Sequence, residues 1–161
     1  MNGAQRIRVT VNGQTYERDV EPRLTLMDFL RHELRLGGTH VGCEHGICGA
    51  CNVMIDGQVA RACLTLAVQA DEAQVTTVEG LRDPATGALH PIQQAFIDAH
   101  GLQCGFCTPG FLMSTFELLR DNPNPGDDEI RHALGGNLCR CTGYQSILAA
   151  VRLAVARLQS T

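Results

Sequence analysis

The 161-residue sequence contains no lysine and no tryptophan, and only 4% of its residues are aromatic. Without lysine it has no phosphate-binding glycine-rich loop of the Gly-Lys type. Acidic side chains outnumber basic ones, and the formal net charge is −4 at pH 7. A nucleic-acid partner is therefore not expected, because phosphate binding needs a basic surface. No apolar run approaches the roughly 18 residues that span a bilayer, so no membrane span is predicted.

The beginning of the sequence also lacks an apolar stretch. Residues 1–11 have none of the hydrophobic core of a secretory signal, so we expect a cytoplasmic location. Disulfides are rare in that compartment, yet the sequence has eight cysteines. Metal binding is the leading explanation for so many cysteines in a reducing environment.

The first half of the sequence has the patterns of a small α+β unit. Alternating apolar and polar residues between turn residues predict strands over residues 7–11, 14–20, 52–55, 58–60 and 75–78. Asn12-Gly13 and Asp56-Gly57 predict tight hairpin turns, because both positions of such a turn need positive φ. Apolar side chains at helical spacing predict a helix over residues 24–36 that ends at two glycines.

The second half has the patterns of a helical unit. The change comes at residues 81–87, which are typical of a linker. Helices are predicted over residues 92–100, 109–120, 127–134 and 144–158. Pro91 suits a helix start, and three acidic residues at 127–129 suit another. The sequence thus predicts an α+β chain of two domains, residues 1–80 and residues 81–161, with four cysteines in each.

The first four cysteines have the spacing Cys-x4-Cys-x2-Cys, followed after eleven residues by a fourth. They are Cys43, Cys48, Cys51 and Cys63. This spacing begins like that of plant-type ferredoxins, in which four thiolates hold a [2Fe–2S] cluster. Gly42, Gly46 and Gly49 interleave these cysteines, as a backbone that wraps a compact cluster requires. A zinc site is the competing interpretation, but zinc sites usually have two Cys-x2-Cys knuckles, which this spacing matches poorly.

The second four cysteines form two close pairs separated by 31 residues. They are Cys104, Cys107, Cys139 and Cys141. Each pair lies in a break between predicted helices, where helix N-termini direct amides and positive dipole ends toward an anionic centre. On spacing alone this quartet predicts either a second [2Fe–2S] cluster or a zinc site. A redox-active dithiol at the first pair is less consistent with the sequence, because no βαβ pattern precedes it.

The six histidines do not form a predicted site. His45 lies within the first cysteine loop, but a Rieske-type centre needs two histidines in place of two cysteines. The other histidines are scattered, at positions 32, 40, 90, 100 and 132. We find neither a nucleophile–base pair nor a pair of catalytic carboxylates. The chain is therefore predicted to have no substrate chemistry of its own.

Three motifs together resemble one family. They are GCEHGICGAC at residues 42–51, QCGFCTPG at residues 103–110 and GNLCRCTGY at residues 136–144. With them, nearly the whole chain resembles the iron–sulfur small subunits of the xanthine oxidase/aldehyde oxidase family of molybdenum hydroxylases, most nearly the carbon monoxide dehydrogenase type. The resemblance implies a second [2Fe–2S] cluster on the second quartet. It also implies an N-terminal ferredoxin-like β-grasp domain followed by a C-terminal all-α four-helix bundle.

The resemblance further implies an electron relay within a heteromeric complex. Electrons would pass from a molybdenum–pterin cofactor on a large subunit to the C-terminal cluster, then to the N-terminal cluster, and then to FAD on a medium subunit. The complex would be a dimer of heterotrimers. The residues matching Gln103 and Cys141 contact the pterin in the family, and an amide side chain offers suitable donors and an acceptor. On spacing alone, Gln103 could equally make a polar contact at a helix end.

Two other functions fit the cysteine pattern. A free-standing two-cluster ferredoxin would shuttle electrons between diffusing partners, and a zinc-stabilised module would bind other proteins. The helical second half and Gln103 favour the relay subunit, because a shuttle needs neither. Copurification with partners separates the relay from the shuttle, and acid-labile sulfide separates both from the zinc module.

Overall fold

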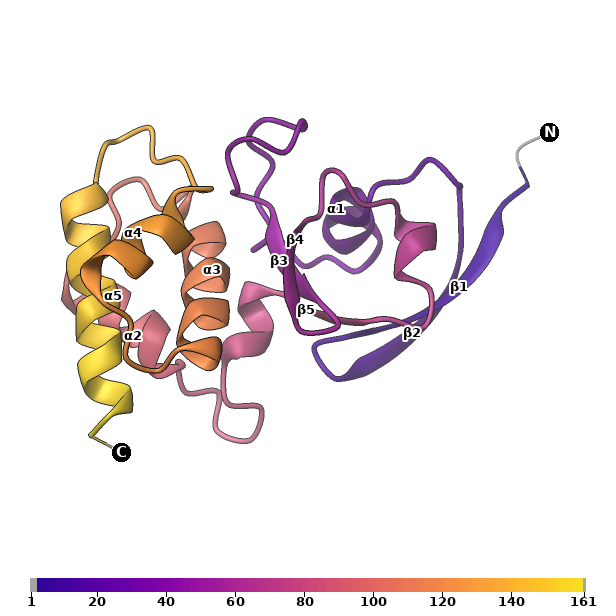
Figure 1. The fold of residues 1–161 in the computed structure, drawn as a ribbon. Coiled ribbons are helices and arrows are strands. Elements are labelled where there is room, and N and C mark those ends of the chain that lie inside the picture. Colours follow the sequence, from indigo (N-terminus) through magenta and orange to yellow (C-terminus); the bar gives the residue numbers. More distant parts are fainter. Residues whose placement is uncertain (1–2, 161) are drawn as a thin grey trace.

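The computed structural model of the chain describes residues 3–160, so residues 1, 2 and 161 of the two predicted domains lie outside it. Figure 1 shows a β-sheet part and a helical part side by side, with β1 and α5 at opposite ends of the molecule. This is the α+β architecture that the sequence predicts. No helix among the described residues is both long and apolar enough to cross a membrane.

The sheet part contains five strands. They are β1 (Gln5–Val11), β2 (Gln14–Val20), β3 (Asn52–Ile55), β4 (Gln58–Arg61) and β5 (Gln74–Thr76). Their order is β2-β1-β5-β3-β4; β1 and β5 run parallel, and the other neighbours run antiparallel. Both hairpin turns are confirmed, because φ is positive at Asn12 (52°) and Gly13 (80°) and at Asp56 (49°) and Gly57 (84°).

The helix predicted over residues 24–36 is wrong in length and in type. A single helical turn, α1 (Leu26–Asp28), continues as a π-helix over Phe29–Glu33. The Leu34 N–H donates to the Phe29 carbonyl, five residues back, over 3.1 Å. Arg35 then takes a φ of 60° and ends the segment before the two glycines. The wider turn buries Phe29 and Leu30 completely, a packing outcome that apolar spacing does not reveal.

The helical part contains the four predicted helices, with bounds within two residues of those expected. They are α2 (Pro91–Asp98), α3 (Thr108–Asp121), α4 (Asp127–Leu134) and α5 (Tyr144–Leu158). Helix α2 packs on α5, and α3 packs on α4. His90 caps α2, because its Nδ1 accepts a hydrogen bond from the Ile92 N–H over 3.2 Å. Short 3-10 turns at Ala67–Ala70 and Val78–Leu81 were not predicted.

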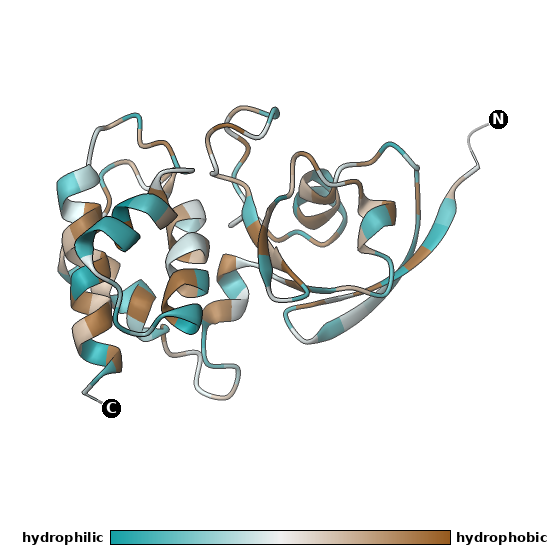
Figure 2. Cartoon of the chain, viewed as in Figure 1, coloured by the Kyte–Doolittle hydropathy of each residue, from teal (hydrophilic) through white to brown (hydrophobic). Residues whose placement is uncertain are grey.

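Each part has its own hydrophobic core, and the two cores meet at the β3–β4 hairpin. Figure 2 shows apolar residues recurring along both the helices and the sheet. Met54 of β3 belongs to the core of the helical part, and α3 packs directly on β3 and β4. Leu81 is buried in the same core, whereas residues 82–88 are exposed. The division at residues 80 and 81 stays a prediction.

Candidate metal centres

The first quartet of cysteines lies around the β3–β4 hairpin. Cys51 directly precedes β3 and Cys63 follows β4, so the hairpin returns Cys63 to Cys51, and the two thiols lie close enough to interact. The thiols of Cys43 and Cys48, from the loop before β3, also lie close enough to interact. Cys48 lies close enough to Cys63 for their charges to interact. The structure thus brings all four predicted residues together.

The loop before β3 needs glycine at the three positions that the sequence singles out. Gly46 and Gly49 have φ values of 80° and 72°, which other residues adopt rarely. Gly42 is required for a different reason, because a Cβ there would lie 2.8 Å from the Cys48 sulfur. These glycines let the backbone fold closely around the sulfurs.

Backbone N–H groups of this loop point at sulfur. The Cys48 N–H donates to the Cys43 Sγ over 3.4 Å. This hydrogen bond, with another from the His45 backbone, lowers the pKa of Cys43 to about 6. Burial has the opposite effect on Cys51 and raises its pKa to about 11. A bound cation would lower the pKa of Cys51 and favour its thiolate form.

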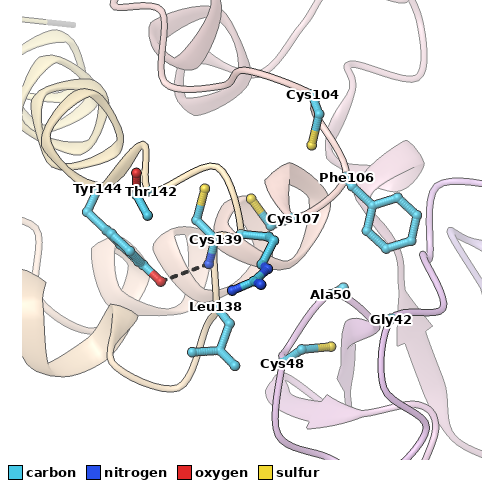
Figure 3. A pocket seen from close by; sticks show the side chains of 11 residues that line it. Gly42, Cys48, Ala50, Cys104, Phe106, Cys107, Leu138, Cys139, Thr142 and Tyr144 are labelled. Atoms are coloured by element: carbon cyan, nitrogen blue, oxygen red, sulfur yellow. Dashed lines mark hydrogen bonds between the residues drawn. The ribbon is translucent and has the colours of Figure 1, made fainter.

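The second quartet comes from the two breaks between helices. Cys104 and Cys107 lie just before α3, and Cys139 and Cys141 lie between α4 and α5. The Cys104 thiol lies close enough to that of Cys141 to interact with it, and the Cys107 thiol lies as close to that of Cys139. Figure 3 shows the sulfurs of Cys104, Cys107 and Cys139 pointing into the same space. This predicted quartet is also brought together.

Two helices begin at this second site. Helix α3 starts at Thr108 and α5 at Tyr144, so both direct N–H groups and positive dipole ends toward the cysteines. The Gly143 N–H donates to the Cys139 Sγ over 3.4 Å, and the Cys139 N–H donates to the Tyr144 hydroxyl over 2.9 Å. Burial, with the neighbouring Cys139 thiol, raises the pKa of Cys107 to about 12. A bound cation would favour the thiolate form of Cys107 as well.

The two cysteine sites are adjacent. A cavity of about 500 Å³ lies between them, bounded by Cys48 and Ala50 on one side and by Cys104, Cys107 and Cys139 on the other (Figure 3). The two loops also touch directly, because the Leu138 N–H donates to the Cys48 carbonyl over 2.9 Å.

A second contact joins the loops through glycines. A Cβ at Gly110 of α3 would lie 2.0 Å from the carbonyl oxygen of Gly49, so only glycine allows this approach.

Sequence reasoning missed a third contact. His40 Nδ1 lies 2.7 Å from the Phe106 carbonyl oxygen, and the two rings stack with centroids 4.8 Å apart. No local signal marks His40, because its partner is 66 positions away.

The remaining predicted site residue, Gln103, lies at the surface of the second site. Its side chain is exposed, and a Cβ at Gly143 would lie 3.4 Å from its Nε2. His45 is exposed in the first loop and belongs to no group of three or more possible metal ligands among the described residues. Nothing in this arrangement assigns either residue a partner molecule.

The donor sets fit [2Fe–2S] clusters. Each quartet offers four thiols, backbone N–H groups directed at sulfur, and glycines or helix N-termini around them, as a cluster of two irons requires. Among residues 3–160, no three cysteine, histidine or carboxylate side chains are arranged as ligands of a single metal ion.

Known proteins match both parts of the chain. Residues 9–78 match a family described as "2Fe-2S iron-sulfur cluster binding domain", and residues 77–152 match one described as "[2Fe-2S] binding domain". Caffeine dehydrogenase subunit gamma of Pseudomonas sp. (strain CBB1) is 56% identical, over 91% of this chain and 88% of that protein. Nicotine 6-hydroxylase small subunit of Paenarthrobacter nicotinovorans is 55% identical, over 90% and 86%. A chain of quinoline 2-oxidoreductase from Pseudomonas putida 86 superimposes with a TM-score of 0.91 at 44% identity, over 98% of each chain.

Proposed function

This chain belongs to the iron–sulfur small subunits of the xanthine oxidase/aldehyde oxidase family of molybdenum hydroxylases, and on that premise we propose the route that electrons take through it. It is the electron-transfer component of an oxidoreductase complex and carries two [2Fe–2S] clusters. The clusters supply one-electron redox chemistry. The residues of the chain hold them, set their separation and orient them toward partners.

The eight cysteines are the cluster ligands in this proposal. The N-terminal cluster is held by Cys43, Cys48, Cys51 and Cys63. The C-terminal cluster is held by Cys104, Cys107, Cys139 and Cys141. The thiol contacts within each quartet and the N–H donors at the Cys43 and Cys139 sulfurs support this assignment.

The contact between Leu138 and Cys48 carries the proposed route. Leu138 immediately precedes Cys139, a proposed ligand of the C-terminal cluster, while Cys48 is a proposed ligand of the N-terminal cluster. The two proposed ligands, Cys139 and Cys48, are therefore connected by a path of covalent bonds that contains a single hydrogen bond of 2.9 Å. With both clusters bound, this contact would offer a path for one electron at a time toward the N-terminal cluster, and no bond of the chain would be made or broken.

Electrons enter at the C-terminal cluster from a molybdenum–pterin cofactor on a large subunit. Gln103 and Cys141 contact the pterin in this proposal. The exposed amide of Gln103, beside Gly143, is free to offer donors and an acceptor to a pterin edge. Electrons leave from the N-terminal cluster to FAD on a medium subunit.

Exposed apolar side chains around both clusters support permanent partners over a diffusing shuttle. Ile47 and Leu64, beside the first loop, are 60% and 61% exposed, and Phe106 and Leu138, beside the second site, are 48% and 50% exposed. Such side chains grouped around a functional site are typical of surfaces that a partner covers.

The finer architecture belongs to the same proposal. The chain folds as a ferredoxin-like β-grasp domain over residues 1–80 and a four-helix bundle of α2 to α5 within residues 81–161. The separate cores of the two parts support this division. The complex is a dimer of heterotrimers in the cytoplasm.

Coexpression with the products of neighbouring genes tests the proposal. A tag on this chain should recover a large subunit with molybdenum and a medium subunit with FAD. A chain that keeps both clusters but stays monomeric under these conditions would contradict the relay and support the free-standing ferredoxin.

A further inference from the structure

Arg61 touches the loops of both candidate clusters. It is the last residue of β4, two positions before Cys63. Its Nε donates to the carbonyl of Gly46 in the first cysteine loop over 3.2 Å. Its Nη2 donates to the carbonyl of Gly136, three positions before Cys139, over 2.6 Å. One guanidinium thus bridges two loops that are 90 positions apart in the sequence.

The third contact of Arg61 leads into a buried polar chain. Its Nη1 donates to the Asn52 side-chain oxygen. The Asn52 amide donates to the Ser114 hydroxyl over 2.9 Å, and that hydroxyl donates to the Asn137 side-chain oxygen over 2.9 Å. The Asn137 amide donates in turn to the Gly49 carbonyl over 3.2 Å.

This polar chain lies in the protein interior, where its geometry is fixed. Asn52, Ser114 and Asn137 are only 2%, 7% and 3% exposed. A hydrogen-bond network at such burial is costly to break, because each freed group would stay without a partner. The hydrogen-bond network runs from Arg61 to the Gly49 carbonyl in the first cysteine loop. Asn137, one of its members, immediately precedes Leu138 in the sequence.

We propose that Arg61 is a positioning residue for electron transfer between the two clusters: by holding both loops, it keeps the Leu138 N–H on the Cys48 carbonyl. This inference rests on the proposed function, in which one electron leaves the C-terminal cluster and reduces the N-terminal cluster by one electron. The rate of electron transfer between two clusters falls steeply as the distance between them increases. A residue that fixes the separation therefore sets the rate without touching either cluster.

The shape of the arginine side chain explains why an arginine can bridge the two loops. The three acceptors are bound by three different nitrogens of the guanidinium, which offers five N–H donors in a planar fork. A lysine ammonium is a single point of charge and cannot reach all three acceptors. Arg61→Lys therefore keeps the charge and the aliphatic stem but loses the bridge, whereas Arg61→Gln also loses the charge.

Arg120 offers a matched control. Its Nη1 donates to the carbonyl of Gly57, so it too joins the helical part to the β3–β4 hairpin. That contact lies at the hairpin turn and touches neither cysteine loop. Arg120→Gln therefore removes an arginine–carbonyl bridge between the same two parts without altering the contact between Leu138 and Cys48.

The test uses the full chain purified with its clusters and partner subunits. Two readouts are taken: the magnetic interaction between the two reduced clusters in the EPR spectrum, and hydrogen exchange at the Leu138 amide. In Arg61→Lys and Arg61→Gln we expect a weaker interaction and exchange about tenfold faster, the factor for about 1.4 kcal/mol of lost protection. Exchange of the β1 amides, which reports global opening, should stay unchanged in Arg61→Lys.

The possible outcomes separate the inference from its premise. If Arg61→Lys and Arg120→Gln both match the wild type in the two readouts, the inference about Arg61 is wrong while the relay stands. If the wild type itself holds no pair of interacting clusters, the proposed function fails first. If the Arg61→Gln variant loses its iron, the inference about Arg61 is tested with Arg61→Lys alone, by the same two readouts.

Discussion

The backbone N–H of Leu138 lies 2.9 Å from the carbonyl oxygen of Cys48 and donates a hydrogen bond to it. One partner is a proposed ligand of the N-terminal cluster, and the other immediately precedes Cys139, a proposed ligand of the C-terminal cluster. The contact joins two parts with separate cores, so its persistence depends on how those parts pack.

Replacing Cys104 should remove one cluster and spare the other. In Cys104→Ala we expect about half the iron and sulfide and the loss of one EPR signal, because each [2Fe–2S] cluster needs four thiolates. Turnover of the assembled complex should stop, since in the proposed route electrons enter at the lost cluster. Leu102→Ala, in the same break between helices, is the control and should keep both signals. Wild-type turnover in Cys104→Ala would contradict the proposed order of the relay.

Replacing Gln103 should leave both clusters intact. The Gln103 side chain is exposed, so its loss costs the fold little. In Gln103→Ala we expect unchanged EPR spectra but weaker association with the molybdenum subunit or slower cluster reduction, measured by copurification and stopped-flow absorbance. Gln58→Ala, an exposed glutamine on β4, is the matched control. If both variants associate and reduce alike, Gln103 does not belong to the site.

Adding one methyl group at Gly110 should push the cysteine loops apart. A Cβ there would lie 2.0 Å from the Gly49 carbonyl oxygen, which is backbone and cannot rotate away. Alanine favours a helix over glycine by about 0.5–1 kcal/mol, but overpacking of this kind costs about 1–3 kcal/mol. The free energy of unfolding should therefore fall in Gly110→Ala, and the EPR interaction between the clusters should weaken.

A second glycine provides the control for this prediction. A Cβ at Gly37 would meet nothing within 4 Å, and its φ is not positive, so Gly37→Ala should be close to neutral. If chemical denaturation gives equal stability for Gly110→Ala and Gly37→Ala, the close approach of the loops is not as the structure describes it.

His90 should make the stability of the helical part depend on pH. Burial lowers the pKa of His90 below its ordinary value of 6.5, and its Nδ1 accepts the hydrogen bond that caps α2. The unfolded chain therefore binds a proton more readily than the folded chain does. Stability from this group is fully present above pH 6.5 and is lost as the pH falls below that value.

The variant His90→Asn isolates this effect. Asparagine can still cap the helix but does not titrate. Melting temperatures of the wild type should fall more steeply than those of His90→Asn between about pH 7 and pH 5.5, the range over which a depressed histidine pKa acts. Parallel pH profiles for the two proteins would rule out His90 as the titrating group.

Much of the fold could be predicted because its signals are local. Asn12-Gly13 and Asp56-Gly57 mark hairpins by the backbone conformations that they allow, and α5 was predicted with the bounds that it has, Tyr144–Leu158. The helix over residues 24–36 failed because apolar spacing fits an α-helix and a π-helix almost equally over so short a segment. Only the surrounding core decides between them.

The cysteine quartets could be predicted because their spacing is itself the signal. The contacts that join the two sites could not, since they pair residues far apart in the sequence. Asn137 bonds to Gly49 across 88 positions, and Arg61 bonds to Gly136 across 75. No local sequence pattern marks these residues, because their contacts form only when distant parts of the chain pack together.

The most direct test of the account is the iron and acid-labile sulfide content of anaerobically purified protein, together with the EPR spectrum of the dithionite-reduced sample. Two [2Fe–2S] clusters predict about four irons and about four sulfides per chain and two distinct signals. Zinc without sulfide, or half that iron with a single signal, would contradict the two-cluster relay.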